Sequence, residues 1–310
     1  MIAQLERVRV SRPVPYLSRP IPHSSLDAAS PDHPDPQCTA MPLSEGCQKE
    51  AAIRLASCRS DWLSAFRLIY EAYTRTGLAT ANPRGMRVTP YQLLPTTEIL
   101  VATEKDRVVC TLSVVCDGLL GLPLEDIYAD EVALRRKQGL VVAEVSCLAN
   151  GQDGDRSSFS TLLEVMRLCA QTAKARGIDQ LLIAVHPNHA PFYERFLGFE
   201  RFGEERTYGA VLDAPAVALA LDLNHLADKH PQGYKRLFGT PFPAVQLAYR
   251  PMPDDLRGEL ALSMPDLAES NECTRKRQPQ ADNPVACANC KNVCRRRALI
   301  ALKAPATFAL

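Results

Sequence analysis

The sequence predicts an α+β fold, a mixed sheet with helices on its faces. Two alternating apolar segments, 99–103 and 108–115, are joined by a short charged turn and indicate a β-hairpin. Two more strand-like segments, 140–148 and 180–186, are separated by a long amphipathic helix pattern. A hairpin that leads into a sheet whose later strands alternate with helices is typical of the α+β class.

The composition excludes several classes of protein. The 310 residues are 46% hydrophobic, which is enough for a buried core. Thirty-six basic and 35 acidic residues give a net charge of +1, so the whole chain offers no electrostatic reason to expect nucleic-acid binding. The longest apolar segment, 214–221, is far shorter than the roughly 20 residues of a membrane helix, although peripheral membrane contact stays open.

The cysteines and the N-terminus predict a cytoplasmic location. The first 20 residues lack the apolar stretch of a secretory signal, since arginines and prolines interrupt them. Eleven cysteines are spread unevenly, and an odd number without a signal peptide indicates reduced thiols.

Three regions follow from the distribution of residue types. Residues 1–50 contain eight of the 24 prolines and little hydrophobic periodicity, so we expect a disordered leader. Residues 51–250 form the predicted folded domain. Residues 251–310 form a basic, cysteine-containing tail that we also expect to be disordered, because 271–310 has eight basic and two acidic residues and no core periodicity.

The predicted elements follow in order. The first helix runs from Asp61, its cap, to about residue 76, and Gly77 ends it. After the hairpin, a second helix covers 123–138, with acidic residues at its start and basic residues at its end. The long helix covers about 158–176. A short helix at 189–196 and strands at 199–202 and 217–223 complete the domain.

The strand 140–148 contains two polar residues on one face. With a period of two, Glu144 and Ser146 lie on the face of Val142 and Leu148, opposite Val145 and Cys147. A buried carboxylate is costly unless it is paired or used. Glu144 is therefore either hydrogen-bonded to a neighbouring helix or arginine, or it acts in catalysis or acceptor binding, where burial would raise its pKa toward neutrality.

The segment 186–199 leads from a strand through a short helix into the next strand. Tyr193 in this helix is either a core residue or a functional one. His186 and His189 lie three residues apart, but no nearby residue completes a metal ligand set, so we interpret them as structural histidines.

Several motifs in order resemble the FeeM-type N-acyl amino acid synthases, which share the GNAT fold and are relatives of acyl-homoserine-lactone autoinducer synthases. Residues 192–199, Phe-Tyr-Glu-Arg-Phe-Leu-Gly-Phe, are similar to a motif near the end of the GNAT fold. The other matching segments are 111–118, 121–128, 134–135, 143–146, 186–190 and 215–219. The resemblance covers about half of the chain and implies a mixed, mostly antiparallel sheet with helices on both faces.

The resemblance implies an enzyme that transfers a fatty acyl group from a thioester to the α-amine of an amino acid. In the GNAT fold two parallel strands part and the pantetheine arm lies between them; here these strands are 140–148 and 180–186. By position, Glu144 matches the general base, and Tyr193 matches the general acid that protonates the departing thiolate.

The donor depends on the loop 150–158. GNAT enzymes that use coenzyme A have a glycine-rich loop here whose amides hold the pyrophosphate. This chain has two aspartates and a different glycine spacing, which favours acyl carrier protein over acyl-CoA as the co-substrate. Arg156, Ser157 and Ser158 are candidates for holding the single phosphodiester of the pantetheine arm, unless they form an ordinary polar loop with a serine cap. We expect no resident cofactor.

The loop 82–91 is where these enzymes build an acceptor pocket. Arg84 or Arg87 is a candidate for binding the carboxylate of the amino acid, although most surface arginines are only solvated.

The tail contains the spacing C-x2-C-x3-C. Cys273, Cys287, Cys290 and Cys294 supply four thiolates, so zinc or an iron–sulfur cluster stays open beside a disordered tail. The basic residues beside them would attract an acidic carrier protein, anionic lipid or nucleic acid.

The sequence thus predicts an N-acyltransferase that moves a fatty acyl group from acyl carrier protein to an amino acid. Two alternatives stay open, an acetyl-CoA-dependent GNAT acetyltransferase of a small amine and a catalytically idle GNAT module used for binding.

Overall fold

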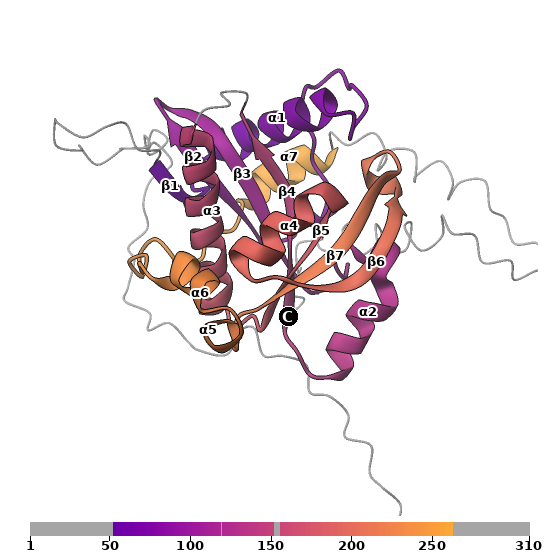
Figure 1. Cartoon of the computed structure of the whole chain (residues 1–310). Helices are drawn as coiled ribbons and strands as arrows, with labels where there is room; N and C mark the ends of the chain where they lie inside the picture. The colour runs from indigo at the N-terminus through magenta and orange to yellow at the C-terminus, as the bar shows by residue number, and fades with distance from the viewer. Residues whose placement is uncertain (1–51, 119, 152–155, 263–310) are drawn as a thin grey trace, which may run out of the picture. The chain divides into compact units, whose positions relative to one another are not determined.

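The computed structural model describes residues 52–118, 120–151 and 156–262 (Figure 1). Its core is a seven-stranded sheet in the order β1-β2-β3-β4-β5-β7-β6. Every neighbouring pair is antiparallel except β4 and β5. The prediction of a mixed, mostly antiparallel sheet is therefore confirmed. The strands are β1 (Ala52–Leu55), β2 (Thr97–Glu104), β3 (Arg107–Cys116), β4 (Val142–Asn150), β5 (Gln180–Val185), β6 (Glu200–Tyr208) and β7 (Ala214–Asp222).

Helices cover both faces of the sheet. The longer ones are α1 (Arg59–Arg75), α2 (Glu125–Lys137), α3 (Arg156–Ala175), α6 (Pro231–Phe238) and α7 (Asp254–Leu262). The short ones are η1 (Pro90–Leu93), η2 (Pro187–His189), α4 (Ala190–Phe192), η3 (Tyr193–Leu197), η4 (Gly209–Val211) and α5 (Leu226–Lys229).

Alternation along the strands divides the core between the two faces. Leu181 and Ile183 of β5 pack in the cluster under α3, whereas Leu182 between them packs in the cluster under α2. On β2, Ile99 and Val101 point instead into the cluster under α1. Because side chains alternate across a strand, α3 covers one face and α1 and α2 cover the other.

The start of α1 differs from the prediction. Helix α1 begins at Arg59 with Cys58 at the cap position, so Asp61 is the third residue of the helix. Asp61 is buried, accepts a hydrogen bond from the backbone N–H of Ser57, and pairs with Arg54 of β1. The prediction that Asp61 is the cap was wrong, because its carboxylate folds back onto the residues before the helix in a capping box.

The chain after β7 packs on the domain. In α7, beyond the predicted domain boundary at residue 250, Leu256 and Leu260 are buried in the cluster under α1. Glu98 of β2 forms a largely buried ion pair with Arg176, just after α3, with 2.7 Å between oxygen and nitrogen. The guanidinium of Arg176 also lies over the ring of Tyr249. The packed region therefore includes residues up to Leu262.

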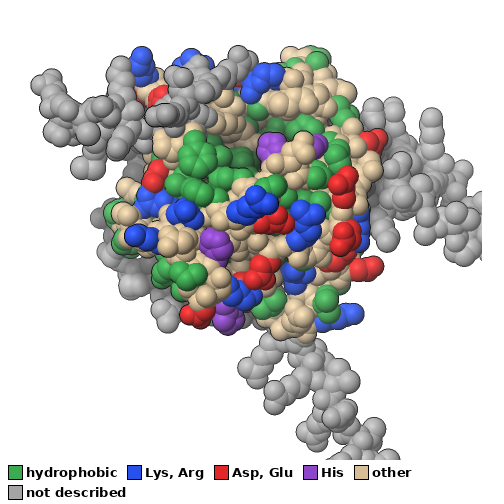
Figure 2. Space-filling view, in the orientation of Figure 1, with side chains coloured by type: hydrophobic (Ala, Val, Ile, Leu, Met, Phe, Trp, Pro, Cys, Tyr) green, Lys and Arg blue, Asp and Glu red, His purple; other side chains and the backbone are tan. Residues whose placement is uncertain are grey.

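Charges of both signs are interspersed on the surface. On the face shown in Figure 2, Lys and Arg side chains lie among Asp and Glu side chains, which agrees with the near-neutral net charge. Within the described residues, no helix has both the length and the apolar composition that crossing a membrane requires.

Candidate functional site

Parallel strands β4 and β5 are paired only at their first residues. The ladder joins Val142 to Gln180, Ala143 to Leu181, and Glu144 to Leu182, although β4 continues to Asn150. The last pair is therefore at Glu144. Beyond it no ladder pairs β4 with β5, and we call this unpaired stretch the opening; the resemblance implies that a pantetheine arm would lie there.

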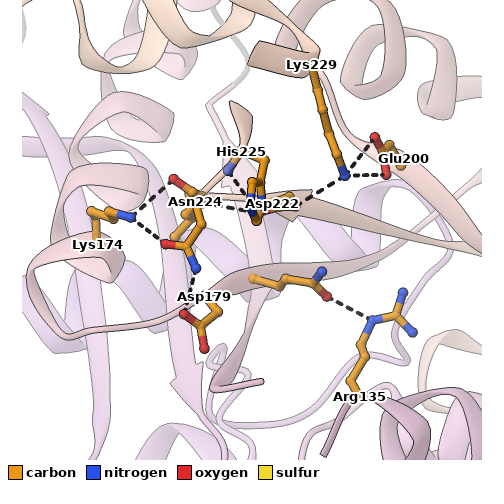
Figure 3. Close-up of polar contacts among 10 residues, drawn as sticks. Arg135, Lys174, Asp179, Glu200, Asp222, Asn224, His225 and Lys229 are labelled. Atoms are coloured by element: carbon orange, nitrogen blue, oxygen red, sulfur yellow. Dashed lines mark hydrogen bonds and ion pairs between the residues drawn. The ribbon is translucent and has the colours of Figure 1, made fainter. Parts of the chain in front are cut away.

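The closed end of this opening is fastened by Asp179. Its backbone N–H donates to the carbonyl of Val141, and its carboxylate accepts from the N–H of Val141, both over 2.8 Å. Asn224 and Lys174 continue this network at the end of β7, with 2.8 Å from Asn224 Nδ2 to Asp179 Oδ1 (Figure 3). These bonds hold β4 and β5 together at their N-terminal ends, so only their C-terminal ends are unpaired with each other.

Strand β4 contains a bulge directly after Ser146. The pairing of β4 with β3 shifts here, and Cys147 has a left-handed backbone with φ of 53°. Cys147 packs in the cluster under α1, while Val145 and Leu148 pack against the cluster under α3. The prediction that Cys147 shares a face with Val145 was wrong, because the bulge interrupts the alternation of the strand.

Glu144 is buried at the start of α2. Its side chain is 2% exposed, and its Oε2 accepts a hydrogen bond from the backbone N–H of Leu124 over 2.7 Å. Burial raises the pKa of Glu144 well above its usual range, and the charges of Asp126 and Glu125 act in the same direction, whereas the hydrogen bond opposes them. Both sequence interpretations keep support, since the carboxylate is hydrogen-bonded to the start of a helix and its raised pKa is suited to a proton acceptor.

Tyr193 lies in the cluster under α3, on the other face of the sheet from Glu144. Its ring packs edge-on against Phe192 and Phe199, with centroids 5.1 and 5.5 Å away. Burial raises the pKa of Tyr193 to about 12, so the phenol is protonated at neutral pH and can act as a proton donor. The packing equally fits the core interpretation, and the structure describes no hydrogen bond between Tyr193 and Glu144.

Tyr73 of α1 connects the two candidates electrostatically. Burial raises the pKa of Tyr73, and the charges of Cys147, Arg87, Tyr193 and Glu144 also act on its hydroxyl. The helical spacing of Tyr73 indicates burial but carries no signal for its electrostatic interaction with Glu144.

The two candidate arginines differ in their surroundings. Arg84 is exposed. The guanidinium of Arg87 lies over the ring of Tyr73, 4.9 Å from the centroid, and its Nη2 donates to the carbonyl of Ala210 over 3.1 Å. The Nε of Arg87 is buried and has no hydrogen-bond partner among the described residues. Arg87 therefore has an unused donor beside the candidate site.

The other predicted residues are described to different degrees. Ser146 is half-buried, with its hydroxyl 3.7 Å from the sulfur of Cys147. Arg156, Ser157 and Ser158 form the first turn of α3, and their side chains lie outside the described part of the chain. The tail cysteines also lie outside it: Cys273, Cys287, Cys290 and Cys294.

No metal site is formed by the residues that the structure describes. Within these ranges no group of three His, Cys, Asp or Glu side chains is placed to hold an ion. His186 and His189 are both exposed, and the Nδ1 of His186 accepts a hydrogen bond from the N–H of Asn188.

The comparison with known proteins agrees with this geometry. The sequence profile of the N-acyl amino acid synthase FeeM family matches residues 64–222, which is just over half of the chain. This chain belongs to the FeeM family. None of the curated proteins matches it. The FeeM family assignment makes the chain an acyltransferase, and it places β4, β5, Glu144 and Tyr193 inside the matched region.

Solved structures show the same architecture. The structure of FeeM, an N-acyl amino acid synthase from uncultured soil microbes, is 26% identical, with a TM-score of 0.53 over 58% of this chain and 94% of that chain. The AHL synthase LasI is 20% identical, with a TM-score of 0.49 over 64% of this chain and 98% of that chain. The likeness to the FeeM structure confirms the expected GNAT-type acyltransferase fold for this FeeM-family chain.

Proposed function

We propose that this chain transfers a fatty acyl group from acyl carrier protein to the α-amine of an amino acid. The observation that carries the proposal is the position of Glu144, a buried carboxylate with a raised pKa at the last pair before β4 and β5 part. An acceptor amino acid arrives with its amine protonated, so a base of raised pKa beside the opening is what N-acylation requires.

The transfer balances with the groups at hand. Glu144 takes a proton from the ammonium, the free amine attacks the thioester carbonyl, a C–N bond forms and the C–S bond breaks. Tyr193 donates its proton to the departing thiolate, and the second proton that the nitrogen loses as it becomes an amide restores the Tyr193 phenol, while the proton on Glu144 passes to solvent after the transfer. The bulge at Cys147 interrupts the β3–β4 ladder beside Glu144, and a backbone amide released from a ladder is suited to the carbonyl oxygen as it gains charge.

Arg87 is the proposed ligand of the acceptor carboxylate. Its buried Nε lacks a partner, and leaving a buried charged donor unsatisfied costs free energy that a bound carboxylate would recover. Arg84 is exposed and is the weaker candidate. Ser146, half-buried at the bulge, is a further candidate contact to the substrate.

The carrier-protein donor rests on the residues 150–158. The phosphodiester would meet Arg156, Ser157 and Ser158 at the first turn of α3, where backbone N–H groups favour an anion. The two aspartates of this loop disfavour a pyrophosphate. We also expect a cytoplasmic location, because an odd and unevenly spread set of eleven cysteines indicates reduced thiols.

A donor and acceptor competition tests the proposal. Purified protein is incubated with acyl carrier protein that is loaded with a long acyl chain, or with the matching acyl-CoA. Amino acids or their carboxamides are the acceptors, and the products are identified by mass spectrometry. We expect N-acyl amino acids, faster from the carrier protein, and little acylation of the carboxamides. Faster transfer from acyl-CoA would contradict the carrier protein as donor. Equal acylation of amino acids and their carboxamides would contradict the assignment of Arg87 to the acceptor carboxylate.

A further inference from the structure

One peptide group joins two buried side chains at the start of α2. The N–H of Leu124 donates to Oε2 of Glu144 over 2.7 Å. The carbonyl of Pro123, which belongs to the same peptide group, accepts a hydrogen bond from the hydroxyl of Tyr208 over 3.0 Å. Tyr208 is 8% exposed and Glu144 is 2% exposed. The hydroxyl, the peptide and the carboxylate therefore form one buried chain of hydrogen bonds.

The peptide group is held in place on both sides. The N–H of Leu122 donates to Oε1 of Glu125 over 2.6 Å, and the carbonyl of Pro123 also accepts from the N–H of Asp126 over 3.2 Å. At Tyr128 the backbone is non-helical, which separates this first turn from the rest of α2. The first turn is thus a short, separately anchored unit beside Glu144.

Hydrogen bonds in series polarise one another in a buried setting. When the Tyr208 hydroxyl donates to the carbonyl of Pro123, it draws electron density away from the amide nitrogen. The N–H of Leu124 then becomes a stronger donor, and a stronger donor stabilises the ionised form of Glu144. We propose that Tyr208 is a positioning residue that sets the proton affinity of Glu144 through the peptide group between Pro123 and Leu124.

The other groups around Glu144 act on it directly. From α2 the carboxylates of Asp126 and Glu125 disfavour its ionised form, and the electrostatic neighbours from other elements are Tyr73 of α1, Cys147 of β4 and Tyr208 of β6. Burial raises the pKa of Tyr208, so its hydroxyl remains a donor throughout the range in which Glu144 titrates. A change at Tyr208 therefore changes a hydrogen bond and adds or removes no charge.

Tyr128 supplies a matched control. Its hydroxyl is also buried and also contacts backbone carbonyls, those of Glu204 and Ala216, both over 2.7 Å. These carbonyls belong to β6 and β7, and neither is part of the peptide group that binds Glu144. Tyr128→Phe therefore removes a comparable hydrogen bond that ties α2 to the sheet while leaving the chain from Tyr208 to Glu144 intact.

The proton affinity of Glu144 is measured without substrate. Protein with carbon-13 in its glutamate carboxyl groups is titrated by NMR, and Glu144→Gln assigns the signal. In Tyr208→Phe we expect the midpoint of the Glu144 titration to move to higher pH by about 0.2 to 0.6 pH unit, whereas Tyr128→Phe leaves it in place. In Tyr208→Phe the carbonyl of Pro123 loses the tyrosine hydroxyl but still accepts a hydrogen bond from the N–H of Asp126.

A second replacement reverses the sign and preserves the hydrogen bond. Tyr208→3-fluorotyrosine has a more acidic hydroxyl, so the Glu144 midpoint should move to lower pH even if Tyr208→Phe does not fold. An unchanged midpoint in 3-fluorotyrosine protein, or an equal shift in Tyr128→Phe, would overturn the inference.

The inference uses the proposed role of Glu144 only for its consequence in catalysis. If the titration shifts as expected while no donor and acceptor pair reacts, the proposed function fails and the link from Tyr208 to Glu144 stands. If transfer occurs but the midpoint does not respond to Tyr208, the proposed function stands and the link fails. In an active protein, the pH dependence of kcat/KM should move with the titration.

Discussion

Glu144 and Leu182 are the last paired residues of the parallel strands β4 and β5. The carboxylate therefore lies where the sheet changes from a closed ladder to an opening, and the first turn of α2 binds it there. A buried acid at this point costs stability, and the proposed role of Glu144 as a general base would account for that cost.

Glu144→Gln should abolish transfer and improve stability at alkaline pH. Loss of a general base lowers kcat by about 100- to 10,000-fold. Because burial raises the folded-state pKa of Glu144 above its unfolded value, the wild-type protein loses stability as the pH rises through the folded-state pKa. The Glu144→Gln variant has no carboxyl group to ionise here. Its Tm should therefore decrease less between pH 6 and pH 9 than the Tm of the wild-type protein. An equal decrease in both proteins would argue against a raised pKa.

Arg87→Gln should weaken acceptor binding and leave the donor unaffected. Loss of a charge-assisted contact to a carboxylate raises the KM of the amino acid by about 10- to 100-fold. Arg84→Gln is the control, because Arg84 is exposed and should change this KM little. Initial rates at varied acceptor concentration distinguish the two, and an equal effect of both variants would remove the assignment to Arg87.

Tyr193→Phe should lower the rate without changing the packing. The rings of Phe192 and Phe199 contact the aromatic ring of Tyr193, which phenylalanine keeps. If the hydroxyl protonates the thiolate, single-turnover rates fall by about 100-fold while Tm stays within 2 °C or so of wild type. An unchanged rate would assign Tyr193 to the core alone.

The ion pair between Glu98 and Arg176 should contribute more to the free energy of unfolding than the exposed pair between Arg59 and Glu259. Glu98 is 2% and Arg176 is 13% exposed, so Glu98→Ala removes largely buried charge-assisted hydrogen bonds and lowers the free energy of unfolding by about 1.5 to 3 kcal/mol. Glu259→Ala breaks an exposed pair with Arg59 and should cost less than about 1 kcal/mol. Urea denaturation measures both values, and similar losses would contradict the burial argument.

Much of the fold is predictable from local signals. The hairpin of β2 and β3, the helix α3 and its end near Gly177 follow from periodicity and turn residues, because these elements bury one face each. Helix α7 is not predictable in this way. Its buried residues share a cluster with α1, and α7 contacts η1; both elements lie far earlier in the sequence, so no local pattern records these contacts.

The candidate site shows the same division. Glu144 is visible in the sequence because a carboxylate interrupts an apolar strand. Tyr208 is not, since the predicted strand ended at residue 202 and the partner of its hydroxyl, Pro123, is 85 residues away. The sequence also does not reveal that Cys147 lies on the opposite face of the sheet from Val145. This change follows from a bulge, which depends on the register between two strands and not on either strand alone.

The most direct test of the account compares wild-type protein with Glu144→Gln in one reaction. Each purified protein is incubated at pH 7 to 9 with pooled amino acids and with acyl carrier protein that is loaded with a long acyl chain. The products are followed by mass spectrometry. The account predicts N-acyl amino acids from the wild type and almost none from a folded Glu144→Gln variant. Equal product from both proteins would contradict a catalytic role for this carboxylate, and no acylated amino acid from the wild type would contradict the proposed reaction.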